Sequence, residues 1–501
     1  SAAYAAGLTG AGSRIAIIDS GLDVEHLSFN PGAFLYSLSL MAQQKGMDPD
    51  TYIESLDLLD AEEIAAVMPY LNIAQELEAL GLSAEDLMVN AKVAFGFNYI
   101  DSDTNLSHLY DTGSEHGSHV AGIAAANAYV PNDDGGYDNA LQTVKTQGVA
   151  PDAQLMVMKV FGVNGGAYDS DYMVAIEDAV MLGADSINLS LGSSSAGMAT
   201  ARTQEFEQIL ENLERSGVVV SISAGNNGSW ADNTYNGYMY LDDVNLQTGG
   251  SPGSFKNSLG VASIENVGTT GDYLIANGGY LIPFYESSYS NAPIGTIAGD
   301  YEYVFLNGVG KAEEFAALMT AMGVESLEGK IVVCLRGEIA FAEKANNAVA
   351  CGATAVVIMN TEDLLINMNL EDYTGTAPVV SVPGYTMSAF TTNPITGADD
   401  ATIGWTGIIT VNPGPISVGV VGGGAMSSFS SWGVPGNLTM KPEITAPGGN
   451  IYSVGGAYQV ENGQYLFMDH QSYETMSGTS MAAPQVAGMA AILAQYIREA
   501  G

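Results

Sequence analysis

The sequence is poor in basic residues. It contains 14 Lys and Arg against 56 Asp and Glu among 501 residues, which gives a formal net charge of -42. Proteins that bind nucleic acid or anionic membrane surfaces need clustered Lys and Arg. The shortage therefore excludes a nucleic-acid partner and docking on an anionic membrane. Charged residues make up only 14% of the chain, below the roughly 25% of typical domains. The negative net charge therefore comes from a shortage of Lys and Arg rather than from an excess of Asp and Glu.

Cysteines and long hydrophobic runs are also scarce. The two cysteines, Cys334 and Cys351, cannot form a disulfide framework. We expect both to be free and buried, with a bridge between them as an open alternative. No apolar run has the roughly 18 residues that a membrane helix needs, so we expect no membrane span in this chain. Hydrophobic residues nevertheless make up 47% of the sequence, which excludes a disordered protein and provides for a large core.

The first 265 residues predict an α/β fold with a parallel sheet. Short apolar runs alternate there with helix-like segments such as 172–183 and 205–215. Continuous apolar runs are typical of parallel strands that helices cover on both faces. Ligands bind beyond the carboxyl ends of such strands, where Asp19, Ser190 and Asn226 stand. The runs are residues 14–19, 155–160, 186–192 and 218–225.

The composition predicts one parent domain with two insertions. Residues 48–90 have helical periodicity and no strand signals, so we expect a helical insertion at about 40–91. Residues 268–422 are rich in Gly, Thr and Tyr and contain a compact strand–helix–strand unit. From residue 427 the sequence again has the apolar strand-like runs and small residues of the first part. We therefore expect a parent domain made of 1–267 and 423–501, interrupted by a smaller β-rich α/β domain.

Three segments contain residues that can carry out chemistry together. Asp19 ends a strand, His116 precedes a helix of small residues, and Ser480 follows a Gly-rich turn that enters another such helix. A serine hydroxyl is a weak nucleophile that needs a base within hydrogen-bond distance and a third group to orient that base. The chain order Asp, His, Ser is that of subtilisin among the unrelated catalytic triads.

These segments resemble the signatures of the subtilase (subtilisin-like serine peptidase) family. Five supporting segments occur in the family's order, at residues 148–153, 188–192, 224–228, 429–433 and 441–448. Together they cover most of residues 10–265 and 425–495. The resemblance implies a subtilisin-like fold and a serine endopeptidase that acts on a protein or peptide substrate, with no cofactor required for its chemistry.

The resemblance also implies roles for single residues. Asp19 matches the orienting aspartate, His116 the general base and Ser480 the nucleophile. Asn226 matches the side-chain donor of the oxyanion hole, with the Ser480 backbone amide as its partner. His119, one helical turn after His116, is expected to be a packed neighbour. Two strands would flank the substrate, and their small residues imply a slot for an apolar P1 side chain. Their substrate-binding residues are Ser190, Leu191, Gly192, Ser223, Ala224 and Gly225.

The two insertions indicate a branch of the family. The inserted domain resembles a protease-associated domain, and with the helical insertion it is similar to the cell-envelope proteinases of Gram-positive bacteria, the lactocepin and C5a-peptidase type. This resemblance implies a secreted protein, extracellular or at the cell surface, with an N-terminal propeptide before maturation.

Two alternatives stay open. Asp133, Asp134 and Asp138 lie in a loop where some subtilases hold calcium, and carboxylates suit that ion. Their spacing matches no compact calcium loop, so we prefer solvated acids and keep a structural calcium site as the alternative. The second alternative is a catalytically silent binding or adhesion protein on a subtilase scaffold.

Overall fold

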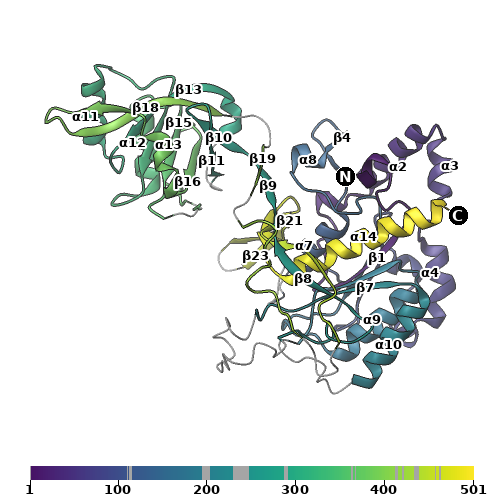
Figure 1. The fold of residues 1–501 in the computed structure, drawn as a ribbon. Coiled ribbons are helices and arrows are strands. Elements are labelled where there is room, and N and C mark those ends of the chain that lie inside the picture. Colours follow the sequence, from purple (N-terminus) through teal and green to yellow (C-terminus); the bar gives the residue numbers. More distant parts are fainter. Residues whose placement is uncertain are drawn as a thin grey trace, which may run out of the picture. The chain divides into compact units, whose positions relative to one another are not determined.

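The chain folds into two compact units in the computed structural model (Figure 1). Unit 1 comprises residues 1–268 and 419–501, and unit 2 comprises residues 269–418. The structure describes residues 2–109, 111, 115–193, 203–228, 248–286, 292–362, 365–366, 368–411, 416–419, 422–433, 439–456, 458–461 and 464–500.

A seven-stranded sheet forms the centre of unit 1, and each of its neighbouring strand pairs is parallel. The strand order is β2-β5-β1-β6-β7-β8-β20. The predicted parallel α/β fold is thereby confirmed. The strands are β1 (Arg14–Asp19), β2 (Val93–Asn98), β5 (Gln154–Lys159), β6 (Ser186–Leu189), β7 (Val219–Ser223), β8 (Leu259–Glu265) and β20 (Ile444–Gly449).

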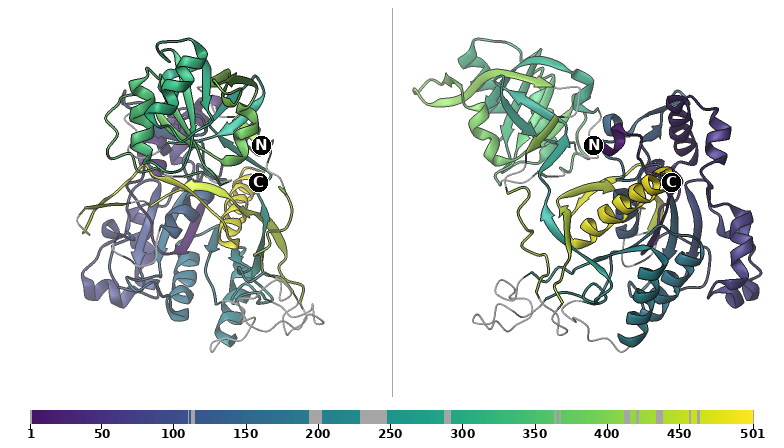
Figure 2. Two further views of the ribbon diagram at one scale, coloured as in Figure 1. Left: turned by 90° about the vertical axis from the view of Figure 1, so that its left-hand side faces the viewer. Right: turned by 45° about the vertical axis from the view of Figure 1, so that its right-hand side comes forward.

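Helices cover both faces of this sheet (Figure 2). Side chains alternate between the two faces along each strand. Ile15 and Ile17 join a core with α7 and α14, whereas Ala16 and Ile18 join a second core with α9 and α10. Each strand is thus buried on both sides, which explains its continuous apolar sequence. The four helices are α7 (His116–Ala125), α9 (Asp169–Met181), α10 (Thr203–Ser216) and α14 (Thr479–Ala500).

The region between β1 and β2 is helical. Ile64, Leu77 and Leu87 from its second half pack into the core that contains α9 and α10, whereas Phe34 belongs to a separate small cluster. The helical region begins before residue 40, because the side chain of Asn30 accepts the Ala33 amide and so caps the first helix. The helices are α2 (Pro31–Lys45), α3 (Pro49–Glu54), α4 (Ala61–Val67), α5 (Ala74–Leu80) and α6 (Ala84–Leu87).

Short elements complete unit 1. An antiparallel pair, β21 and β24, packs beside α7, and β24 runs directly into the turn before α14. The short elements are α1 (Ala2–Ala5), η1 (Leu27–Phe29), η2 (Met68–Tyr70), β3 (Tyr129–Pro131), β4 (Tyr137–Asn139), α8 (Ala140–Thr143), β21 (Ile451–Val454), β22 (Tyr458–Glu461), β23 (Gln464–Met468) and β24 (Tyr473–Met476).

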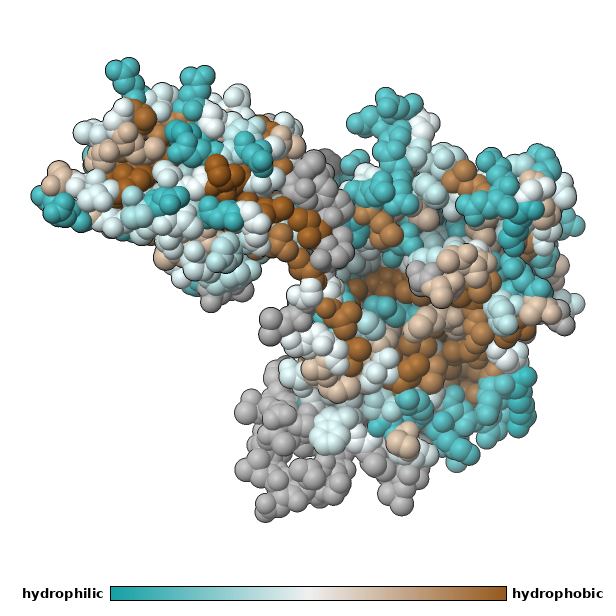
Figure 3. Space-filling view, turned by 45° about the horizontal axis from the view of Figure 1, so that its top comes forward, coloured by the Kyte–Doolittle hydropathy of each residue, from teal (hydrophilic) through white to brown (hydrophobic). Residues whose placement is uncertain are grey.

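The last helix, α14, keeps one apolar stripe in solvent. Met489, Leu493, Tyr496 and Ile497 lie at helical spacing and are each roughly half exposed. In Figure 3 hydrophobic residues gather near the middle of unit 1, and hydrophilic residues surround them. Among the helices that the structure describes, none combines the length and apolar character needed to span a membrane.

Unit 2 is built on a nine-stranded mixed sheet. Strands β13 to β16 are parallel neighbours. The adjacent strands β11 and β12 form the two ends of the strand order, since β11 pairs with β10 and β12 pairs with β16. The sheet therefore closes on itself through the segment that contains β11 and β12. Its strands are β10 (Tyr273–Ala276), β11 (Tyr280–Pro283), β12 (Tyr285–Glu286), β13 (Gly299–Leu306), β14 (Lys330–Leu335), β15 (Ala355–Met359), β16 (Val379–Val382), β17 (Asn393–Thr396) and β18 (Thr402–Val411). The other elements are η4 (Ile294–Ile297), α11 (Ala312–Met322), α12 (Phe341–Ala350), η5 (Gly384–Thr386) and α13 (Met387–Phe390), and the joining strands are β9 (Gly268–Gly271) and β19 (Ile416–Gly419).

Unit 2 has hydrophobic cores of its own. Phe305 and Val333 belong to one cluster, and Val304 and Val332 belong to another on the opposite face of the same strands. Both cysteines lie in this unit and are free, and only Cys334 is fully buried. The identification of this unit as a protease-associated domain stays a prediction.

Candidate active site

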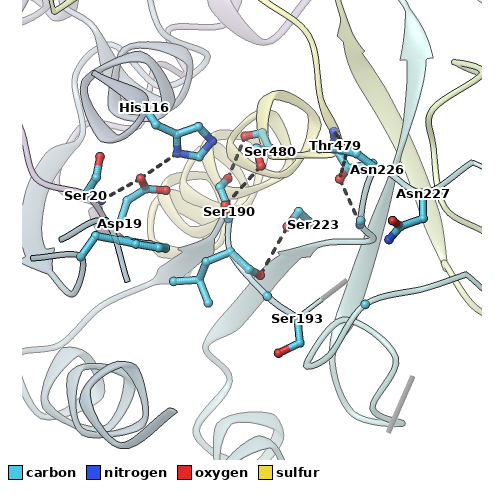
Figure 4. Close-up of a pocket in the computed structure, with 16 residues that line it drawn as sticks. Asp19, Ser20, His116, Ser190, Ser193, Ser223, Asn226, Asn227, Thr479 and Ser480 are labelled. Carbon is cyan, nitrogen blue, oxygen red and sulfur yellow. Dashed lines mark hydrogen bonds and ion pairs between the residues drawn. The ribbon is translucent and has the colours of Figure 1, made fainter. Parts of the chain in front are cut away.

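Residues from four elements converge on one cleft of about 410 Å³ in unit 1 (Figure 4). Asp19 ends β1, His116 begins α7, and Ser480 is the second residue of α14. Asn226 lies three residues beyond β7. All four line the cleft, which opens at the carboxyl ends of the parallel strands.

The carboxylate of Asp19 orients the imidazole of His116. Nδ1 of His116 lies 2.8 Å from Oδ1 of Asp19, which also accepts the backbone amide of Ser20 at 2.7 Å. Asp19 is fully buried, whereas the His116 side chain is 29% exposed. A proton on Nδ1 is held by the carboxylate, which leaves Nε2 as the proton acceptor.

The same pair changes the acidity of His116. Burial lowers the pKa of His116, but the negative charge of Asp19, the hydrogen bond to it and the charge of Glu115 outweigh burial. The pKa of His116 is therefore raised above 6.5. A raised pKa makes the imidazole a stronger base, as proton removal from a hydroxyl requires.

Ser480 lies in the first turn of α14 with its hydroxyl at the cleft. That hydroxyl donates to the backbone oxygen of Ser190 at 3.2 Å. The described part of the chain shows no hydrogen bond between the Ser480 hydroxyl and His116. In enzymes without substrate this bond is often long or poorly aligned and tightens in the complex, so the arrangement is compatible with a nucleophile–base pair.

The side chain of Asn226 is fixed by Thr479. Its Oδ1 accepts the Thr479 amide at 2.8 Å and the Thr479 hydroxyl at 2.9 Å. These bonds occupy the carbonyl end, so the NH₂ end is left as a donor for a bound group. Gly225 has φ +101°, a conformation that favours glycine and turns the chain just before Asn226.

The structure places five of the six predicted substrate-binding residues in the cleft. These five are Ser190, Leu191, Gly192, Ser223 and Gly225. Ala224 does not line it. Side chains alternate along an extended segment, and Ala224, only 5% exposed, borders a separate small cavity instead.

Several residues of the cleft were not predicted from the sequence. Thr479 could have been found as the residue beside Ser480 at the start of a helix. Gly250 and Phe161 come from loops whose position depends on the folded sheet, and no local signal marks them. The additional lining residues are Ser20, Phe161, Gly165, Ser193, Asn227, Gly250 and Thr479.

His119 is a packed neighbour, as expected. It is fully buried, and Nε2 lies 3.1 Å from the backbone oxygen of Ile451 and 3.3 Å from that of Glu474, so it donates to this pair of carbonyls. Burial lowers the pKa of His119 to about 4, so its imidazole is neutral at physiological pH.

A buried lysine lies behind the Asp19–His116 pair. Lys159 is the register partner of Asp19 on the neighbouring strand, and its side chain is 1% exposed. Nζ donates to the backbone oxygens of Ser20 at 2.9 Å and Phe161 at 2.7 Å, and to the carboxylate of Asp111. Lys159 thereby ties the end of β1 to the loop that leads to His116.

The predicted calcium ligands do not form a cluster. Asp133, Asp134 and Asp138 are exposed, and Asp138 accepts a hydrogen bond from the side chain of Asn132 at 3.0 Å. Within the described ranges, no group of three His, Cys, Asp or Glu side chains could hold a metal ion. The loop therefore offers no support for the calcium alternative.

Comparisons with known proteins agree with the sequence motifs. A model described as the subtilase family matches residues 10–500. The chain is 34% identical over 418 residues to a PI-type proteinase of Lactococcus lactis subsp. cremoris and 34% over 417 residues to a PII-type proteinase of Lacticaseibacillus paracasei. It is 29% identical over 411 residues to the C5a peptidase of Streptococcus pyogenes.

These alignments include most of this chain but only part of each relative. They cover 81% of the chain, 20% of each of the two proteinases and 30% of the C5a peptidase. The chain thus spans about a fifth of the length of the first two relatives. The relatives confirm the predicted resemblance to the lactocepin and C5a-peptidase type.

Proposed function

The chain belongs to the subtilase family of serine peptidases, and from this we propose that it is an endopeptidase that hydrolyses peptide bonds through an acyl-enzyme. One observation supports the proposal above all. The 2.8 Å bond between His116 and Asp19 borders the cleft that also contains Ser480 and Asn226. The names of the relatives as proteinases and a peptidase are in accord with it.

In the first half of the reaction, Ser480 attacks the substrate. Its Oγ forms a bond to the scissile carbonyl carbon while the hydroxyl proton moves to Nε2 of His116. Asp19 stabilises the imidazolium that results. The negative charge on the carbonyl oxygen is held by the NH₂ group of Asn226 and by the backbone amide of Ser480.

In the second half, the acyl-enzyme is formed and hydrolysed. His116 gives its proton to the leaving amine as the peptide C–N bond breaks, which leaves the acyl group on Ser480. Water then enters, loses a proton to His116 and attacks the ester carbon. The new carboxylic acid leaves as the proton returns to Ser480.

We propose that the enzyme prefers an apolar P1 side chain. Among the described residues of the cleft, the ionisable ones are Asp19 and His116, which belong to the chemistry, and the walls include Leu191, Phe161 and glycines. A peptide-library cleavage profile tests this preference. Cleavage chiefly after Lys or Arg would contradict it.

A fluorophosphonate probe tests the proposed function directly. It should label the wild-type protein and spare Ser480→Ala. Ser39→Ala is a matched control because Ser39 lies on α2, outside the cleft, and its hydroxyl bonds Leu35. This control should be labelled like wild type. Folded wild-type protein that is not labelled and leaves casein intact would favour the silent binding protein instead.

We also propose that the protein is secreted, extracellular or at the cell surface, and that a propeptide is removed on maturation. The resemblance to cell-envelope proteinases supports this, as do relatives from Lactococcus, Lacticaseibacillus and Streptococcus. Antibody detection on intact cells and N-terminal sequencing of the released protein test it. Detection only after cell lysis would contradict the location.

A further inference from the structure

Pro484 leaves a backbone oxygen next to the nucleophile without its helical partner. In an α-helix the carbonyl of residue 480 would accept the amide of residue 484. Residue 484 is proline, and it lies inside α14. Proline has no N–H, and its ring crowds the carbonyl four residues earlier. The Ser480 carbonyl therefore lacks the donor that residue 484 would supply in a regular helix.

The side chain of Ser190 supplies that donor. Its hydroxyl donates to the Ser480 carbonyl oxygen at 2.7 Å. Nδ2 of Asn188 donates to the Ser190 hydroxyl oxygen at 3.0 Å, which directs the single hydroxyl proton toward Ser480. Asn188 is fully buried and Ser190 is 5% exposed, so water cannot easily replace either bond.

Two hydrogen bonds of opposite direction thus join Ser190 and Ser480 (Figure 4). One fixes the backbone of the nucleophile, and the other, from the Ser480 hydroxyl to the Ser190 carbonyl, opens when the hydroxyl turns to the base. Both fasten the first turn of α14 to the end of β6. Placement matters here because a displacement of about 1 Å can cost roughly a hundredfold in rate.

We propose that Ser190 is a positioning residue for Ser480. Its hydroxyl replaces, as a donor to the Ser480 carbonyl, the amide that Pro484 lacks. This role is distinct from the substrate binding that the motif implies for the Ser190 backbone. It rests on the proposed function, since it assumes that Ser480 is the nucleophile. It predicts that loss of the Ser190 hydroxyl lowers kcat and the labelling rate only while residue 484 is proline.

A double-mutant cycle over Ser190→Ala and Pro484→Ala tests the inference. The four proteins are compared by kcat and KM on one peptide substrate and by the rate of fluorophosphonate labelling. Ser190→Ala should lower kcat and the labelling rate by about tenfold, the worth of one neutral hydrogen bond, and leave KM within about twofold. In the Pro484→Ala background the same change should cost less than about twofold, because the restored amide bonds Ser480.

Ser223→Ala is the matched control. Ser223 also lines the cleft, but its hydroxyl donates to Leu191 at 3.5 Å and not to Ser480. Its effect should be the same factor in both backgrounds, and melting curves establish that all variants are folded. Wild-type protein that neither cleaves nor is labelled would refute the proposed function. Active wild type with an equal Ser190→Ala effect in both backgrounds, or with a raised KM and unchanged kcat, would overturn the positioning role alone.

Discussion

At the residue scale, Asp19 has two separable effects on His116. It holds the proton on Nδ1, and its charge raises the pKa of an imidazole that burial alone would make more acidic. In the proposed mechanism the neutral imidazole is the active form. Activity should therefore be complete above the raised pKa and should fall as pH drops through a midpoint higher than 6.5.

Asp19→Asn should remove both effects. We expect kcat to fall by roughly 10⁴, because an amide favours the wrong tautomer of the imidazole. The remaining activity should decline at lower pH than in wild type, since burial then dominates and lowers the pKa of His116. The measurement is kcat/KM as a function of pH.

The matched control for this substitution is Asp300→Asn in unit 2. Asp300 is exposed and accepts a hydrogen bond from Thr410. Its replacement should therefore leave unchanged both kcat and the acid limb, which is the fall of kcat/KM at low pH. A folded Asp19→Asn protein whose acid limb coincides with that of wild type would show that Asp19 does not set the pKa of His116.

At the element scale, the buried strands were predictable, but their order in the sheet was not. The apolar run 14–19 became β1 with the same bounds, because a strand covered on both faces has a continuous local signature. The order of the sheet, the closure of the sheet in unit 2 and the approach of Phe161 to the cleft depend on pairings between distant segments. No local pattern encodes such pairings.

The site shows the same limit. Asp19, His116 and Ser480 were predicted because family motifs mark them, and the structure brings all three to one cleft. Lys159 also has a local oddity, a lone charge in an apolar run, but its partner Asp111 is 48 residues away. The two hydrogen bonds between Ser190 and Ser480 join residues that are 290 positions apart in the sequence. Only the folded sheet reveals these pairs.

The buried pair of Lys159 and Asp111 should stabilise the elements around His116. Lys159→Met leaves the carboxylate of Asp111, whose side chain is 8% exposed, without its partner. We expect the free energy of unfolding to fall by about 3–5 kcal/mol, as when one partner of a buried ion pair is removed. Urea-induced unfolding measures the change.

Two comparisons sharpen this experiment. Adding Asp111→Leu to Lys159→Met should recover part of the loss, because the unpaired charge is then gone. Lys45→Met breaks a pair with Glu499 whose side chains are 34% and 41% exposed, and should cost less than about 1 kcal/mol. Equal losses in Lys159→Met and Lys45→Met would refute a special role for the buried pair.

At the scale of the whole molecule, the shortage of bases is more severe at the surface than in the composition. Of the described basic residues, Lys92, Lys159 and Lys344 are buried to 1% exposure or less. Others are held in ion pairs, such as Arg14 with Glu63 and Arg498 with Asp185. The surface is therefore strongly acidic, which favours solubility and repels anionic substrates.

This distribution predicts resistance of the folded protein to trypsin. Trypsin needs a Lys or Arg in an accessible, locally unfolded segment. The chain has only 14 Lys and Arg, and several of those that the structure describes are buried or ion-paired, whereas 28 of the 56 acidic residues are glutamates. The Ser480→Ala variant should be used, so that self-digestion does not contribute. We expect it to survive severalfold longer in trypsin than in a glutamate-specific peptidase of equal activity on a denatured reference protein.

In urea both peptidases should degrade it. Rapid trypsin cleavage without urea would mean that folding does not protect the basic residues that remain.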